Sequence, residues 1–104
     1  VQIADRTHAI TREEPAAEWI LYCYGPSLNP AADSSVTVLG RYADSKRPAA
    51  LAVSYGSGRA FLIGTHPEIE EDDDRDGTTD SDAYDDRGSD WPLLRAAVDW
   101  CTAR

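Results

Sequence analysis

The sequence contains no methionine, one lysine and two cysteines, and these scarcities exclude several classes of protein. Lys and Arg together number 10 against 19 Asp and Glu, which gives a formal net charge of −9. Binding to nucleic acid or to an anionic membrane requires a positive face, so neither partner is expected. No apolar run approaches the length of about 18 residues that a transmembrane helix needs. The two cysteines lack the spacing of a metal site.

The 104 residues predict a single domain, and a chain that opens on Val1 without any methionine is expected to be part of a longer protein. An acid-rich, lysine-poor surface is typical of proteins from a high-salt cytoplasm, so we expect a halophilic, cytoplasmic protein. An ordinary acidic domain with one charged loop is the alternative, because the acids concentrate in residues 69–90. Cys23 and Cys101 lie in apolar contexts and are expected to be free, buried thiols.

Apolar patterning predicts the elements outside the central part of the chain. Residues 19–24, Trp-Ile-Leu-Tyr-Cys-Tyr, indicate a strand that is buried on both faces. Tyr22 and Tyr24 either pack there or line a ligand pocket, and packing is the commoner role of strand aromatics. Residues 36–42 alternate as a second strand, and residues 91–103 have helical spacing, with Ser89 and Asp90 as the N-cap.

The central stretch, residues 49–68, predicts a tight β-hairpin. Two short apolar runs, 50–55 and 59–64, flank Gly-Ser-Gly, and glycine accepts positive φ at no cost. The second run leads directly to His66-Pro67-Glu68. A histidine beside a carboxylate is the base and orienter that activates a nucleophile, so His66 and Glu68 are the candidate catalytic residues. Arg59, just after the turn, is expected to form an ion pair with an acid of residues 69–90, with anion binding as the alternative.

The run from Tyr55 to Glu68, Tyr-Gly-Ser-Gly-Arg-Ala-Phe-Leu-Ile-Gly-Thr-His-Pro-Glu, resembles the closing segment of class I glutamine amidotransferase-like domains. It is most similar to the group related to the N-terminal domain of biotin-protein ligase. Trehalose-utilisation-like proteins share the Gly-x-Gly-Arg hairpin and a terminal helix containing Trp. The resemblance implies an α/β fold: the C-terminal part of a flavodoxin-like domain, with a small mixed sheet, a β-hairpin and a C-terminal helix.

The resemblance also implies that His66 and Glu68 belong to a Cys-His-Glu triad, but the chain has no nucleophile elbow. Cys23 lies in Leu-Tyr-Cys-Tyr-Gly, without the small neighbours that a sharp strand-to-helix turn needs, and Cys101 falls within the predicted helix. We therefore expect an amidotransferase-like domain without glutaminase activity of its own, whose partner is the missing N-terminal half of the domain or another chain. The alternatives are a non-catalytic domain that binds a small ligand or a protein, and a calcium-stabilised module.

The acidic stretch, residues 69–90, is typical of a solvated loop because it has hardly an apolar residue to bury. Residues 72–77, Asp-Asp-Asp-Arg-Asp-Gly, also fit the start of a calcium loop, in which oxygen ligands alternate and a glycine follows. The candidate Ca²⁺ ligands are carboxylates at or near the alternate positions: Asp72, Asp74, Asp76, Asp80 and Asp82. Position 12 of such a loop is Ala83 in place of the usual Glu, so both interpretations remain open. No other cofactor is expected.

Overall fold

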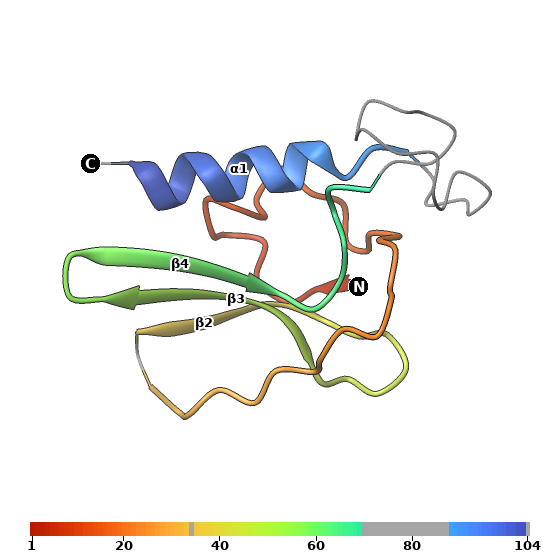
Figure 1. Ribbon diagram of the computed structural model, residues 1–104, viewed down its shortest axis with the longest axis horizontal. Coiled ribbons are helices and arrows are strands. Elements are labelled where there is room, and N and C mark those ends of the chain that lie inside the picture. The colour runs from red at the N-terminus through yellow and green to blue at the C-terminus, as the bar shows by residue number, and fades with distance from the viewer. Residues whose placement is uncertain (34, 70–87, 104) are drawn as a thin grey trace.

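A computed structural model describes residues 1–33, 35–69 and 88–103. In these residues four strands form one sheet in the order β1-β2-β3-β4, and one helix lies along one side of it (Figure 1). The elements are β1 (Gln2–Ile3), β2 (Val36–Arg41), β3 (Pro48–Tyr55), β4 (Gly58–Ile63) and α1 (Trp91–Thr102). The small sheet with a C-terminal helix agrees with the expected combination of strands and helix.

The sheet of the described residues is antiparallel throughout, so the expectation of a mixed sheet was wrong for this part of the chain. Short connections explain the antiparallel pairing of β2, β3 and β4. A parallel pair needs a crossover of a dozen or more residues, whereas residues 42–47 join β2 to β3 and two residues join β3 to β4. Consecutive strands with such short connections can pair only antiparallel.

The predicted hairpin is confirmed. Tyr55 pairs with Gly58, which leaves Gly56 and Ser57 as a two-residue loop. Gly56 has φ +59, a conformation that residues with a Cβ seldom adopt, whereas Gly58 is already part of β4. The register then continues without interruption from Ser54–Arg59 to Ala50–Ile63, so the segment after β4 begins at a fixed place beside β3.

The core lies between the sheet and α1. Its buried members come from the N-terminal segment, β2, β3 and α1: Ile10, Leu39, Ala50, Ala52, Leu93 and Ala97. Four consecutive residues of β3, 49–52, are buried, and three of them are alanine. Small side chains in β3 leave room in this core for side chains of the N-terminal segment and of α1. β4, the last strand of the sheet, pairs with β3 and contacts α1.

Residues 19–24 do not form the expected buried strand. Leu21 makes an isolated antiparallel bridge with His66, and the neighbouring aromatics are exposed, Trp19 by 55 %, Tyr22 by 57 % and Tyr24 by 99 %. Tyr24 has φ +53, which ends any extended conformation there. Aromatic side chains with a polar tip suit a surface as well as a strand, and tertiary contacts decided the outcome here. Cys23 is exposed, so its predicted burial was also wrong, although both cysteines are free.

Helix α1 confirms the predicted helix, and both its ends are tied to other parts of the chain. At its start, Asp90 takes the N-cap position and the Ser89 hydroxyl accepts a hydrogen bond from the Trp91 amide at 3.2 Å. Near its end, the Arg59 guanidinium donates to the Trp100 carbonyl at 2.7 Å and lies 5.2 Å from the Trp100 ring centroid. The last carbonyls of a helix are acceptors at the negative end of its dipole, so they attract a cation. Most of the acids that were expected to pair with Arg59 lie outside the described residues.

No helix in the described part of the chain is both long and apolar enough to span a membrane.

The N-terminal segment carries a buried carboxyl group. Glu14 is 8 % exposed, and its pKa is raised to about 7 because burial disfavours the carboxylate. A hydrogen bond with the Glu18 carboxyl and the negative charge of Glu18 act in the same direction. Two positive groups of this segment engage backbone atoms: Arg6 donates to the Glu14 carbonyl, and the Val1 amino group donates to the Glu18 carbonyl.

This burial predicts a pH dependence of stability. A pKa raised in the folded state means that the native protein binds more protons than the unfolded chain between pH 4.5 and about 7. The contribution of Glu14 to the free energy of unfolding is therefore largest below pH 4.5 and decreases as the pH rises to 7. In Glu14→Gln this part of the slope disappears, and the variant melts above the wild type at pH 8. Glu13→Gln, at an exposed side chain, is the control and keeps the wild-type slope when melting temperature is measured from pH 4.5 to 8.

Two glycines let the segment after β4 approach the loop that follows Leu21. A Cβ on Gly25 would overlap the Gly64 carbonyl oxygen, and a Cβ on Gly64 would overlap the Pro26 carbonyl oxygen and the Tyr42 hydroxyl. The Gly64 amide donates to the Ala49 carbonyl at 2.9 Å, which holds this segment beside β3. The contact is therefore backbone on backbone and leaves no room for a side chain.

Replacement of Gly64 by alanine tests this contact. The added methyl group must displace backbone atoms, so Gly64→Ala is expected to lower the free energy of unfolding by about 1–3 kcal/mol. Gly58→Ala is the matched control, because a Cβ there would lie 3.4 Å from the Tyr55 carbonyl oxygen, an ordinary van der Waals contact. Urea denaturation measures both variants, and equal stability of the two would contradict the close approach at Gly64.

Candidate active site

His66 is held at the carboxyl end of β4 by backbone hydrogen bonds. Its amide donates to the Leu21 carbonyl at 2.8 Å, and its own carbonyl accepts a hydrogen bond from the Ile69 amide at 3.3 Å. Pro67, between the two candidate residues, is buried. Proline fixes its own φ and restricts the residue before it, so the chain holds His66 and Glu68 in one relative orientation.

The side chains of His66 and Glu68 are in direct contact. Nδ1 of His66 lies 2.8 Å from Oε1 of Glu68, and the two side chains are 41 % and 52 % exposed. A carboxylate can only accept, so Nδ1 carries the proton of the neutral ring and Nε2 remains the basic nitrogen. This is the arrangement of a general base with its orienting carboxylate. Of the two ring nitrogens of His66, only Nδ1 has a hydrogen-bond partner among the described residues.

Helix α1 supports this pair through Trp91, a residue that sequence reasoning missed. The indole Nε1 of Trp91 donates to the Glu68 carbonyl at 3.1 Å, which anchors the backbone of the orienting residue. The Trp-Pro start of the predicted helix was visible in the sequence, but nothing local indicated that its indole reaches Glu68 across 23 residues. The start of the helix thus takes part in positioning the candidate site.

Thr65, next to His66, has a buried hydroxyl group. It is 6 % exposed, and its Oγ1 has no hydrogen-bond partner among the described residues. A buried hydroxyl without a partner costs about 1–3 kcal/mol, and such groups in native proteins need an explanation, a functional one included. This unfavourable free energy of the buried Thr65 hydroxyl arises in the same short segment that carries the His66–Glu68 pair.

No described nucleophile completes the pair. Cys23 is exposed and Cys101 is partly buried in α1, and neither thiol is hydrogen-bonded to His66 in the part of the chain that the structure describes. The catalytic roles of His66 and Glu68 therefore stay predictions, and the structure shows only the contact between their side chains.

The predicted calcium ligands, Asp72, Asp74, Asp76, Asp80 and Asp82, lie outside the described residues. Among residues 1–33, 35–69 and 88–103, no group of three or more His, Cys, Asp or Glu side chains is placed to hold a metal ion. The calcium interpretation thus remains a prediction from the spacing of the acids.

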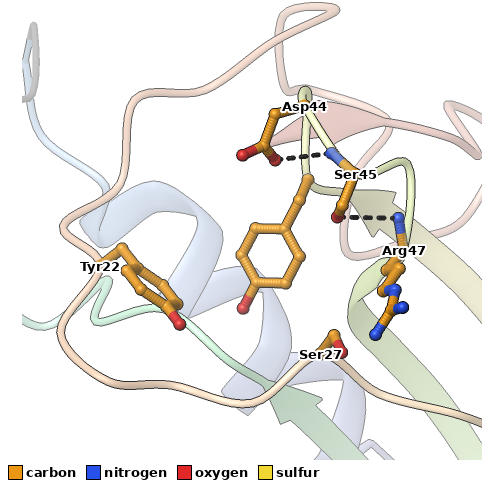
Figure 2. A pocket seen from close by; sticks show the side chains of 6 residues that line it. Tyr22, Ser27, Asp44, Ser45 and Arg47 are labelled. Carbon is orange, nitrogen blue, oxygen red and sulfur yellow. Dashed lines mark hydrogen bonds between the residues drawn. The ribbon is translucent and has the colours of Figure 1, made fainter.

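An open pocket of about 590 Å³ lies beside the loop that carries Tyr22 (Figure 2). It is lined by Tyr22, Ser27, Tyr42, Asp44, Ser45 and Arg47. Of the two tyrosines considered for a ligand pocket, Tyr22 lines it and Tyr24 is exposed to solvent. The polar residues of the β2–β3 turn were not singled out from the sequence, because only the folded chain brings that turn to Tyr22.

Comparison of the chain with protein-family models, with curated proteins and with solved structures gave no match.

The tautomer of His66 tests the geometry of the pair. A carboxylate at Nδ1 favours the tautomer with its proton on Nδ1, whereas a free imidazole prefers the proton on Nε2. Nitrogen-15 NMR of the neutral ring should therefore show the Nδ1–H form in the wild type and a shift toward Nε2–H in Glu68→Ala. Glu13→Ala, at a side chain that pairs only with Arg12 among the described residues, is the control. A wild-type ring protonated on Nε2 would contradict the contact.

Proposed function

We propose that the chain is the C-terminal part of a flavodoxin-like, class I glutamine amidotransferase-like domain. In this proposal, His66 is the general base and Glu68 its orienter in a Cys-His-Glu site. The single observation that carries it is the 2.8 Å contact between Nδ1 of His66 and Oε1 of Glu68 at the end of β4. The resemblance of residues 55–68 to the closing segment of such domains supports it independently.

The chain itself contributes half of the chemistry. Nε2 of His66 would take a proton from a cysteine thiol, and the Glu68 carboxylate would stabilise the imidazolium that forms. The thiol must come from a strand-turn-helix segment outside these residues, on the same polypeptide or on another chain. As it stands the chain is expected to have no glutaminase activity, because loss of one member of a triad lowers the rate by about 10⁴-fold or more.

Glutamine hydrolysis tests the proposal. The purified chain should release ammonia from glutamine at the background rate. A product that also includes a Gly-x-Cys-x-Gly elbow encoded upstream of Val1, or a partner chain that supplies one, should hydrolyse glutamine, and His66→Ala should reduce that rate by about 10⁴-fold.

Glu13→Gln is the control and should leave the rate of glutamine hydrolysis unchanged. If no elbow is encoded upstream and none is supplied by a partner, or if His66→Ala retains the rate, the amidotransferase proposal fails.

A second candidate function, binding of a small ligand without catalysis, is favoured by one specific observation. The pocket beside Tyr22 carries polar, charged and aromatic side chains together in a volume of about 590 Å³. Small-molecule sites commonly have volumes of about 300–1,000 Å³.

A further inference from the structure

The pocket beside Tyr22 is built from two segments that a few hydrogen bonds hold together. The Tyr42 hydroxyl donates to the Pro26 carbonyl at 2.8 Å, and the Leu28 amide donates to the Pro48 carbonyl at 2.8 Å. These bonds tie the loop after Leu21 to both ends of the β2–β3 turn. Neither His66 nor Glu68 lines the pocket, so a ligand there is independent of the amidotransferase proposal.

The β2–β3 turn presents its side chains from a fixed backbone. The Tyr42 amide donates to the Arg47 carbonyl and the Lys46 amide to the Tyr42 carbonyl, both at 3.0 Å. Within the turn, Asp44 Oδ1 accepts from the Ser45 amide at 2.7 Å, and the Ser45 hydroxyl accepts from the Arg47 amide at 3.3 Å (Figure 2). A backbone ordered before binding reduces the entropy that a ligand must offset.

Two tyrosines form the aromatic wall of the pocket. The ring centroids of Tyr22 and Tyr42 are 5.8 Å apart and the rings cross at 86°, an edge-to-face pair. The Tyr22 hydroxyl donates to the Gly25 carbonyl at 2.7 Å, and the Tyr42 hydroxyl donates to the Pro26 carbonyl. Because both phenolic protons are engaged, the wall offers a ligand ring surface and acceptor oxygens.

The pocket also holds one acidic and one basic side chain that do not pair with each other. The Arg47 guanidinium has no hydrogen bond or ion pair with any described residue, and Asp44 uses Oδ1 for the Ser45 amide. In Figure 2, Asp44 lies at the top of the group of side chains, and Arg47 lies at the right with Ser27 below it. The formal charges of Asp44 and Arg47 cancel, and each side chain leaves hydrogen-bonding capacity for a ligand.

We propose that this pocket binds a small zwitterion, with its carboxylate at Arg47 and Ser27 and its ammonium group at Asp44. A guanidinium recognises a carboxylate through two parallel hydrogen bonds, and an ammonium group is attracted both to a carboxylate and to an aromatic face. The net charge of −9 repels a simple anion, whereas a zwitterion carries no net charge. The two charges of the ligand are separated by an aliphatic chain that lies along the tyrosine wall, as in an ω-amino acid.

Three probes that share a six-carbon chain distinguish the contributions of the two charges of the ligand. They are 6-aminohexanoate, hexanoate, which lacks the ammonium group, and hexylammonium, which lacks the carboxylate. Titration of the full chain, followed by amide chemical shifts in NMR, should show saturable shifts at Ser27, Ser45 and Arg47 for 6-aminohexanoate. Each single-charge probe should bind at least tenfold more weakly. Equal binding of all three probes, or shifts that do not saturate for any of them, would overturn the proposal.

Substitutions at each end provide the second test. Arg47→Gln should weaken 6-aminohexanoate binding at least tenfold and leave hexylammonium binding unchanged. Asp44→Asn keeps an acceptor for the Ser45 amide. It should weaken 6-aminohexanoate binding at least tenfold and leave hexanoate binding unchanged. Arg12→Gln and Asp99→Asn, at exposed residues that do not line this pocket, match the charge changes and should bind like the wild type. Unchanged binding in both pocket variants, with the wild-type spectrum otherwise preserved, would refute the assignment.

Discussion

The close approach of two backbone segments at Gly25 and Gly64 is the constraint on which both candidate sites depend. Gly64 continues β4 beside β3, and Gly25 begins the loop that leads to Ser27. One residue beyond this contact along the chain lies Thr65, and then His66 with its bridge to Leu21. The other segment carries the Pro26 carbonyl that holds Tyr42. A side chain at either glycine would separate the segments, so the histidine and the pocket wall share one structural support.

Both ends of helix α1 form hydrogen bonds with β4 or the segment after it. The Trp91 indole donates to the Glu68 carbonyl beyond β4, and the Arg59 guanidinium near the start of β4 donates to the Trp100 carbonyl. The helix is therefore hydrogen-bonded near the start of β4 and again beyond its end. Since β4 leads directly into His66, the orientation of the candidate base is set by contacts that lie mostly outside the site. Supporting contacts of this kind are what hold a reactive geometry in place.

The sequence predicted the elements whose local chemistry and periodicity agree, and failed where tertiary contacts decide. The hairpin followed from two apolar runs around glycine, the helix from its apolar spacing, and the His66–Glu68 contact from two residues separated by a proline. Residues 19–24 have strand-like composition, yet Tyr22 lies at the surface. There its ring packs against Tyr42 and its hydroxyl donates to the Gly25 carbonyl. The pocket could not be predicted, because its two sides come from separate segments of the chain and meet only through such contacts.

The His66–Glu68 pair differs energetically from the contacts that build the fold. Both side chains are about half exposed, and an exposed ion pair or hydrogen bond of this kind contributes only about 0–1 kcal/mol to stability. The buried backbone contact at Gly64 and the indole bond of Trp91, in contrast, belong to the packing of the chain. The fold therefore does not need the pair for its stability, although several structural contacts converge to hold it. Under the proposed function, the pair is therefore held for chemistry at Nε2 of His66 and not for the stability of the fold.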